Sequence, residues 1–310
     1  MIQFVLRRIL YAIPVLLVVA LVTLFLFDIA AGDPAAIKLG KNPSPEAVAA
    51  LHEKMGFNDP FLVKYGKFLW STLTVDFGDS WSDDTPVRTV FKRGIIPTLS
   101  LTLPAFLLGT FVAVILALLV AFYRGSLLDK AMTVVAIAAI SISSLVYILV
   151  FQAVLADAWK LFPVWGYEYG IGAINFIALP VLIWILLSIG TDMRYYRTVA
   201  LEEISRDYVR TARSKGVSEH RVLFSHVLRN CLIPIVTRMA IIVPFLITGS
   251  FLLEIFFGIP GLGTVLYTAI NNSDLPIIKA FTMLGTVLYV TFDIVADISY
   301  AALDPRVRLS

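Results

Sequence analysis

Few residues in this chain could do catalytic or metal chemistry, and their spacing suits neither. His220 and His226 lie six residues apart, which places them nearly opposite each other on a helix. The segment HEK at 52–54 lacks the second histidine of the zinc-protease pattern HExxH. The chain has a single cysteine, Cys231, so it can form neither an internal disulfide nor a metal site built from cysteines. We therefore expect no catalytic residue, no metal and no bound cofactor in this chain, which argues against an enzyme.

A nucleotide-binding site is not expected either. GIPGLG at 258–263 is rich in glycine, but it lacks the lysine of the phosphate-binding loop GxxxxGKS/T, which occurs nowhere else in the sequence. We interpret this segment as a turn in a re-entrant loop. The formal net charge of +3 is also too small to indicate nucleic acid as a partner.

Charge is concentrated instead at 206–230, in the stretch RDYVRTARSKGVSEHRVLFSHVLRN. The residues from 201 to 215 favour a helix, and Gly216 follows at the place of a left-handed C-terminal cap. Ser218 offers the N-cap of a second helix that extends to Arg229. The stretch therefore predicts two helices joined by a glycine elbow.

Two interpretations of this stretch stay open on these residues alone. As a basic loop it would hold the membrane topology and touch anionic lipid head groups, at about 1 kcal/mol per cation. Acids are interspersed with its cations, however, and Ala212 and Gly216 place two small residues four apart on one helical face. A lipid-binding helix would pair a cationic face with an apolar one, so the pattern favours close docking of another protein. The acids are Asp192, Glu202, Glu203, Asp207 and Glu219.

The elements that position this stretch are membrane helices. Hydrophobic residues make up 59% of the 310 residues and charged residues 15%, against about a quarter charged in ordinary globular proteins. A helix needs about 20 mainly apolar residues to cross a bilayer. The first apolar run is longer than a signal-peptide core of about 7 to 15 residues, so we expect it to be retained. The sequence predicts six spans, at 9–31, 97–122, 131–156, 173–193, 231–257 and 279–302.

Cations in the short loops give the orientation. Basic residues near span ends mark the cytoplasmic side. Here they cluster at the N-terminus, after span two, in the tail and, above all, between spans four and five at 194–230. The loops 157–172 and 258–278 carry only one cation, Lys160. We therefore expect both termini and the charged stretch in the cytoplasm, and residues 32–96 outside.

Three parts follow from these spans. Residues 1–31 hold the N-terminus and the first span, 32–96 form a small polar subdomain, and 97–310 form a core of five spans. In the subdomain, PSPEAVAALHEKMG predicts a helix with Ser44 as its N-cap and Gly56 as its stop, and DFGDSWSDDTP predicts turns. The fold class is therefore an all-α polytopic membrane protein.

Several short segments, in their order and spacing, resemble one family along essentially the whole chain. They are RRILYAIPVL, AGDPA, MGFNDPFLVKY, DFGDS with TPV, LFPVWG, SDLPII and DISYAALDPRV. YVRTARSKGVSEHRVLFSHVLRN resembles the cytoplasmic coupling loop, or EAA loop, of binding-protein-dependent ABC importer permeases, in the branch that imports dipeptides, oligopeptides and nickel. Gly216 and Ala212 match the glycine and alanine of that loop, whereas Arg210 stands at its glutamate and Arg229 at its usual proline.

The resemblance implies a type I ABC importer permease in a bacterial or archaeal cytoplasmic membrane. Besides membrane lipid, the implied partners are a second homologous permease in a heterodimer, two cytoplasmic ATPase subunits that hold ATP and Mg, and an extracytoplasmic substrate-binding protein. ATP-driven closure would move the elbow as a rigid lever and tilt the adjoining spans. The ATPase contact is then expected at Arg210, Thr211, Ala212, Lys215, Gly216, Val217, Ser218 and Glu219, within the coupling loop 194–230.

Candidate residues of the pathway or gate are Ser141, Ser144, Tyr147 and Glu254. The first three lie around SISSL in span three, where Ser143 stands at a position that tends to be proline in the family it resembles, a change expected to alter a kink that lines the pathway. Glu254 lies near the outer end of span five, where a buried carboxylate is costly and often functional. Pathway lining and structural pairing are equally open for it. 

The function expected is the permease subunit of an ATP-driven peptide importer. A nickel-complex importer stays open, as do a self-sufficient channel or secondary carrier and a membrane enzyme. A carrier would not need the cytoplasmic elbow. An enzyme would need a nucleophile with its base, or a metal set, that these residues do not supply.

Overall fold

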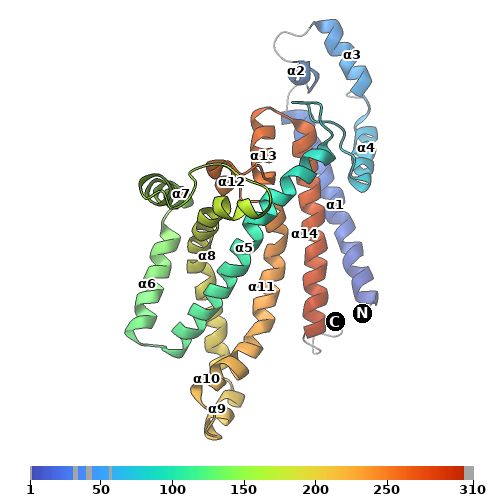
Figure 1. Cartoon of the computed structure of the whole chain (residues 1–310). Coiled ribbons are helices and arrows are strands. Elements are labelled where there is room, and N and C mark those ends of the chain that lie inside the picture. The colour runs from blue at the N-terminus through green and yellow to red at the C-terminus, as the bar shows by residue number, and fades with distance from the viewer. Residues whose placement is uncertain (1, 31–33, 40–43, 56–57, 304–310) are drawn as a thin grey trace. The chain divides into compact units, whose positions relative to one another are not determined.

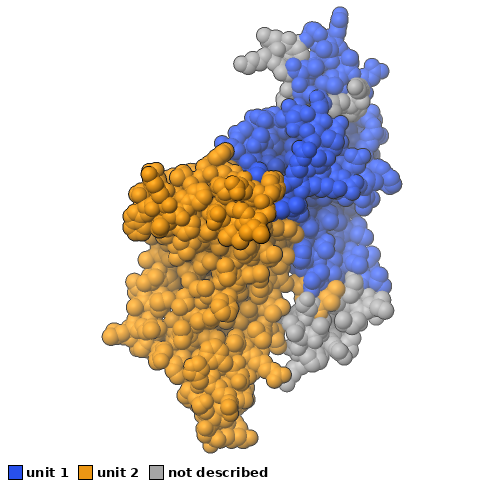
Figure 2. All heavy atoms as spheres, viewed as in Figure 1, with its two compact units in different colours: residues 1–96, 260–295 blue, residues 97–259, 296–310 orange. Residues whose placement is uncertain are grey.

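The computed structural model describes residues 2–30, 34–39, 44–55 and 58–303. Within these ranges the chain is helical, with no strand beyond an isolated bridge between Asp79 and Pro86. It divides into two compact units, made of residues 1–96 with 260–295 and of residues 97–259 with 296–310 (Figure 2). The predicted all-α polytopic fold class is confirmed.

The first unit is built from α1 (Ile2–Ala30), α2 (Pro34–Leu39), α3 (Pro45–Met55), α4 (Phe61–Thr74), α13 (Leu262–Asn271) and most of α14 (Leu275–Leu303) (Figure 1). The apolar face of α4 packs against α1 and α14, where Ala20, Leu24, Phe68 and Met283 are buried together. The hydroxyl of Tyr65 also donates a hydrogen bond to the carbonyl of Leu17, at 2.9 Å. 

The predicted helix in the polar subdomain is confirmed. α3 begins at Pro45, and the amide of Ala47 donates to the hydroxyl oxygen of Ser44 at 3.2 Å. This bond satisfies one of the amides that the first turn of a helix leaves without a partner. The stop predicted at Gly56 lies outside the described residues.

Asp274, at the start of α14, anchors the loop that follows α4. Its carboxylate accepts hydrogen bonds from the hydroxyl of Ser80 and from the amides of Trp81, at 3.1 Å, and Ser82, at 3.3 Å. The carboxylate is fully buried, so these three donors offset the cost of removing its charge from water. A cavity of about 380 Å³ lies beside the anchor, between the loop, α13 and α14.

The second unit contains most of α5 (Val87–Phe122), then α6 (Leu127–Ser141), α7 (Ser144–Phe151), α8 (Ala173–Ile204), α9 (Asp207–Ser214), α10 (Glu219–Arg221), α11 (Leu228–Thr248) and α12 (Phe251–Phe257). π-helical turns at Gln152–Ala158 and Val222–Val227 continue α7 and join α10 to α11. In this unit α9 and α10 lie at the end opposite α7 and α12 (Figure 1).

Among the described residues, five helices are long and apolar enough to cross a membrane, and the number rises to as many as seven if each of two bent helix pairs counts as one span. The prediction of six spans falls within this range, but two predicted spans differ in form. Span three is bent by 93° between α6 and α7, because Ile142 and Ser143 adopt extended backbone. Span five ends at Thr248, where Gly249 has a φ of +86°. α12 and α13 then form a separate pair bent by 86° around GIPGLG.

Two helices extend well beyond the predicted spans. α5 begins at Val87 rather than at residue 97, and its 36 residues rise about 54 Å. α8 continues to Ile204 rather than ending at residue 193. Both exceed the thickness of a bilayer core, so parts of them project from the membrane.

Candidate functional site

The charged stretch folds as an elbow between α8 and α11. α8 runs without a break through the end of predicted span four to Ile204, and a turn at Ser205 and Arg206 then starts α9. The single helix predicted over 201–215 is therefore interrupted. Arg206 causes the interruption, since its φ of −70° and ψ of 151° are extended.

Gly216 forms the predicted left-handed cap, with a φ of +75°. The amide of Gly216 donates to the carbonyl of Arg213 at 2.9 Å, and the amide of Val217 donates to the carbonyl of Ala212 at 3.2 Å. This pair of bonds is the Schellman motif, which satisfies the last carbonyls of α9. No atom lies within 4 Å of where a Cβ of residue 216 would be, so the backbone conformation alone requires glycine.

The second arm of the elbow starts at Ser218, as predicted, although the Ser218 hydroxyl makes no capping hydrogen bond. The carbonyl of Ser218 accepts the amide of Val222 at 2.9 Å. From there α10, the π-helical turn and α11 form one continuous path to Thr248, so the helix does not end at Arg229. The second arm is thus an extension of α11, whereas the first arm, α9, is separated from α8 by the turn at Ser205 and Arg206.

Two polar contacts hold α9 against its neighbouring helices in the elbow. The guanidinium of Arg213 grips Glu219 with Nε 2.9 Å from Oε1 and Nη2 3.0 Å from Oε2. The hydroxyl of Tyr208 donates to Oε2 of Glu203 at 2.6 Å and ties α9 back to α8. Burial, followed by this hydrogen bond, raises the pKa of Tyr208 to about 12. The hydroxyl therefore stays protonated and remains a donor at physiological pH.

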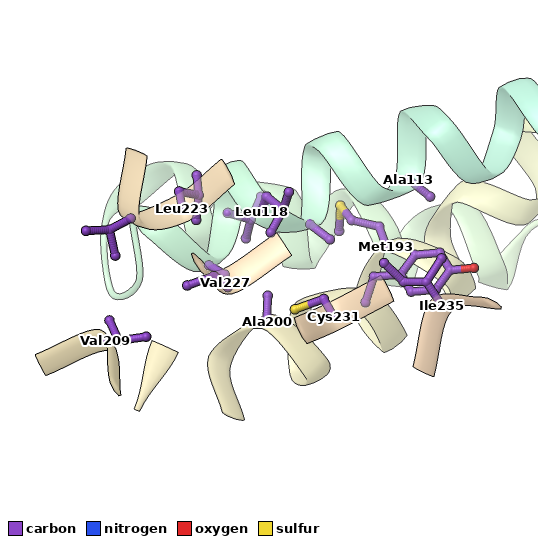
Figure 3. Close-up of a cluster of buried hydrophobic side chains, with 14 of the residues drawn as sticks. Ala113, Leu118, Met193, Ala200, Val209, Leu223, Val227, Cys231 and Ile235 are labelled. Carbon is purple, nitrogen blue, oxygen red and sulfur yellow. The ribbon is translucent and has the colours of Figure 1, made fainter. Parts of the chain in front are cut away.

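An apolar cluster joins the elbow to the membrane helices (Figure 3). Val209 of α9 and Leu223 and Val227 of the π-helical turn pack with the ends of α5, α8 and α11. The membrane helices contribute, among others, Ala113, Leu118, Met193, Ala200, Cys231 and Ile235. Because close-packed interiors transmit displacement, a force on the elbow would reach these helix ends directly.

Ala212 belongs to this cluster and is only 7% exposed. The structure therefore places the methyl group of Ala212 inside the chain rather than on an exposed face with Gly216, and its part in the ATPase contact stays a prediction. The packing of α9 on the cluster decides this, because α9 is amphipathic and turns Val209 and Ala212 inward. The exposed members of the predicted contact are Arg210, Thr211, Lys215, Gly216, Ser218 and Glu219, with Val217 half-buried.

The predicted pathway residues lie in two places. Ser141, Ser144 and Tyr147 flank the bend between α6 and α7, and the hydroxyl of Tyr147 spans it by donating to the carbonyl of Ala139 at 3.2 Å. Glu254 is on α12, which packs with α7 in a second apolar cluster. 

Glu254 is fully buried. Its Oε1 accepts hydrogen bonds from the hydroxyl of Thr98, at 2.9 Å, and from the amide of Ser250, at 3.2 Å. The carboxylate thereby holds the start of α12 against α5. Of the two roles left open by the sequence, this geometry favours structural pairing.

The sequence analysis did not predict the ion pair between Arg238 and Asp192, which joins two of the long helices. Arg238, in the middle of α11, contacts Asp192 of α8, with Nη2 3.1 Å and Nε 3.3 Å from the same Oδ1. Its Cζ lies 4.7 Å from the ring centroid of Tyr195. The available signal was a lone cation inside the apolar run 231–257. 

Comparison with known proteins shows that this chain matches one family of transport proteins. The description "binding-protein-dependent transport system inner membrane component" matches residues 109–309, and the description of the N-terminal part of such components matches residues 1–102. A Brucella abortus (strain 2308) chain, named provisionally as a peptide transport system permease protein, is 35% identical over 312 residues and 99% of both chains. Oligopeptide transport system permease protein AppB of Bacillus subtilis (strain 168) is 32% identical, over 99% of this chain and all of the relative. Glutathione transport system permease protein GsiC of Salmonella paratyphi A is 30% identical over 99% of both chains.

Proposed function

This chain belongs to the family of binding-protein-dependent transport system inner membrane components, and from that membership we propose that it carries peptides across the membrane. It is a permease subunit of an ATP-driven importer rather than an enzyme, since ATP hydrolysis in such importers resides in partner subunits. The relatives compared are named for peptides, oligopeptides and glutathione, and they favour a peptide over a nickel complex.

The observation that carries the coupling proposal is the shared core of the elbow and the membrane helices. Val209 and Ala212 of α9 are buried in the same cluster as the ends of α5, α8 and α11. An ATPase that moves α9 would therefore move those ends with it, without a flexible joint between them. The ATPase docks on the exposed side of α9 and the elbow, at Arg210, Thr211, Lys215, Ser218 and Glu219.

The cation distribution supports the orientation. The elbow carries most of the basic residues near span ends, so it lies in the cytoplasm with both termini. α2, α3, α4 and the loop anchored by Asp274 then lie outside. There they can meet an extracytoplasmic substrate-binding protein.

The complete importer has this chain and a second homologous permease embedded in lipid, with two ATPase subunits below them. The ATPases supply ATP and Mg sites that this chain does not form. Exposed apolar side chains along α1, α5, α6 and α11 are available to the second permease and to lipid.

Reconstitution tests the proposed function. The chain is assembled with a second permease, ATPase subunits and binding protein in vesicles, and the uptake of a labelled tripeptide is measured with ATP supplied on the ATPase side. We expect uptake that requires ATP and the binding protein. ATP-independent uptake would instead favour a secondary carrier, and nickel uptake without peptide uptake would favour the nickel alternative.

A further inference from the structure

The second unit contains two arginine–aspartate pairs on α8, and they differ in how completely they are bonded. In the first, Arg197 Nε and Nη2 each lie 2.9 Å from a different oxygen of Asp129, which also accepts the amide of Gly125. In the second, both bonded nitrogens of Arg238 share Oδ1 of Asp192. Within the described residues, Nη1 of Arg238 and Oδ2 of Asp192 therefore make no hydrogen bond. The second pair is open to another partner.

The open pair lies within the predicted spans, toward their cytoplasmic ends. Asp192 is five residues before Arg197, about 7.5 Å along α8 from the pair that anchors the turn between α5 and α6. Arg238 is seven residues, or about 10 Å, beyond the predicted start of span five at residue 231. Its side chain is nevertheless 31% exposed, against 14% for Asp192. Charged groups inside membrane spans face protein or a water-filled cavity rather than acyl chains, so the exposed edge of Arg238 is expected to face one of these.

Tyr195 also contacts the guanidinium. The Arg238 Cζ lies 4.7 Å from the Tyr195 ring centroid, a cation–π contact that helps to fix the position of the guanidinium. A guanidinium binds a carboxylate best through two parallel hydrogen bonds, one to each oxygen. Asp192 does not provide that geometry here, since only its Oδ1 is engaged.

We infer that the exposed edge of Arg238 faces the translocation pathway, that Arg238 binds the C-terminal carboxylate of the peptide during translocation, and that Asp192 holds the guanidinium when no peptide is bound. This rests on the proposed function of peptide import. Peptides differ in their side chains, but an unmodified peptide always carries a terminal carboxylate. A pathway that accepts many sequences can therefore recognise this group, and a guanidinium offsets the cost of desolvating it.

The test measures uptake of trialanine by the reconstituted importer with Arg238→Gln, Arg238→Lys or Asp192→Asn. Arg238→Gln should lower kcat/KM for trialanine by about tenfold, because the variant loses a charge-assisted bidentate contact with the carboxylate. Its abundance in the membrane should stay normal. Arg238→Lys should restore part of the loss, because it keeps the charge without the fork. Asp192→Asn should lower the KM for trialanine, since the competing carboxylate is gone.

Trialanine amide provides a second readout. The ratio of acid to amide uptake should fall in Arg238→Gln, and any preference of the binding protein cancels when variant and wild type are compared. Arg197→Gln, which breaks the fully bonded pair, is the matched control and should leave this ratio unchanged. If the binding protein does not deliver the amide, the test rests on trialanine alone. Arg238→Gln should then reduce trialanine uptake, whereas Asp192→Asn should lower the KM for trialanine.

Three results would contradict the inference. Equal losses in Arg238→Gln and Asp192→Asn would make the pair a brace between α8 and α11. If the second permease no longer co-purified with the Arg238→Gln variant, the exposed edge of Arg238 would be a contact between the two permeases rather than a peptide site. Failure of the wild-type importer to take up either peptide would overturn the proposed function itself, and with it this inference.

Discussion

Arg213 and Glu219 join the two arms of the elbow through a bidentate ion pair, with Nε–Oε1 and Nη2–Oε2 distances of 2.9 and 3.0 Å. Arg213 belongs to α9 and Glu219 starts α10, so the pair closes over Gly216. Both side chains are more than 40% exposed, and exposed pairs contribute little to stability. The pair matters for the angle between the arms, which a docked ATPase would have to maintain.

The orientation can be tested by cysteine labelling, because the only native cysteine, Cys231, is 2% exposed. Ser44→Cys should react with a membrane-impermeant maleimide added to intact cells, since Ser44 is exposed and lies on the proposed outer side. Lys215→Cys should react only after the membrane is permeabilised. The reverse pattern would invert the topology.

Ala212→Trp should destabilise the chain rather than only weaken docking. Ala212 is 7% exposed within the elbow cluster, and inserting a large ring there costs about 1 to 3 kcal/mol or more. Membrane abundance and thermal unfolding in detergent measure the effect. Thr211→Trp is the control, because Thr211 is exposed on the neighbouring position. It should keep abundance and reduce ATPase co-purification. Equal abundance of the two variants would contradict the burial of Ala212.

Glu254→Gln should be tolerated, whereas Glu254→Leu should not. Glutamine keeps an oxygen that can accept the Thr98 hydroxyl and the Ser250 amide. Leucine removes this acceptor from the buried Thr98 hydroxyl and the partly buried Ser250 amide, and a buried donor that loses its acceptor costs about 1 to 3 kcal/mol. Thermal stability in detergent and uptake should therefore fall together in Glu254→Leu. If Glu254→Gln abolished uptake at normal stability, Glu254 would act in the gate rather than as a structural pair.

Asp274→Ala should loosen the loop that contains Ser80. The substitution removes the acceptor of one hydroxyl and two backbone amides without touching the helices themselves. Limited proteolysis of the purified importer should then cut within 76–86 several times faster. Asp84→Asn is the control, since Asp84 is exposed, its φ of +53° suits asparagine, and its ion pair with Lys38, at 3.6 Å, is a surface contact. Equal cleavage in both variants would contradict the anchor.

The local features of the elbow were predictable because they depend on neighbours in sequence. Gly216 supplies a positive φ that few other residues adopt, and Ser44 caps the helix that starts at the next residue. Such signals need only a few residues of context. The membrane spans were predictable for the same reason, since hydropathy over about 20 residues suffices.

The missed features depend on tertiary packing. Nothing near Ala212 in sequence shows that α5 and α11 would cover it. The family resemblance indicated a kink near Ser143, but its size of 93° could not be predicted, since no proline or glycine marks it. Asp192 and Arg238 lie 46 residues apart, so their pairing appears only when α8 and α11 pack together. The continuity of α10 with α11 through a π-helical turn was hidden by polar residues typical of a loop.

Gly216→Val should uncouple the importer without unfolding it. Valine is strained at a φ of +75° by about 1 kcal/mol or more, although no neighbouring atom would clash with its Cβ. The elbow should therefore relax to another angle. Gly216→Asn is the matched control, because asparagine tolerates the left-handed conformation and places a side chain in the same open space.

The most direct measurement of the coupling role is the number of ATP molecules hydrolysed per peptide imported by vesicles that contain equal amounts of each variant importer. For Gly216→Val this number should rise several-fold, or ATPase subunits should be lost on purification, while Gly216→Asn stays close to wild type. A wild-type ratio and wild-type ATPase binding in Gly216→Val would contradict the account that the elbow transmits ATP-driven motion to α5, α8 and α11.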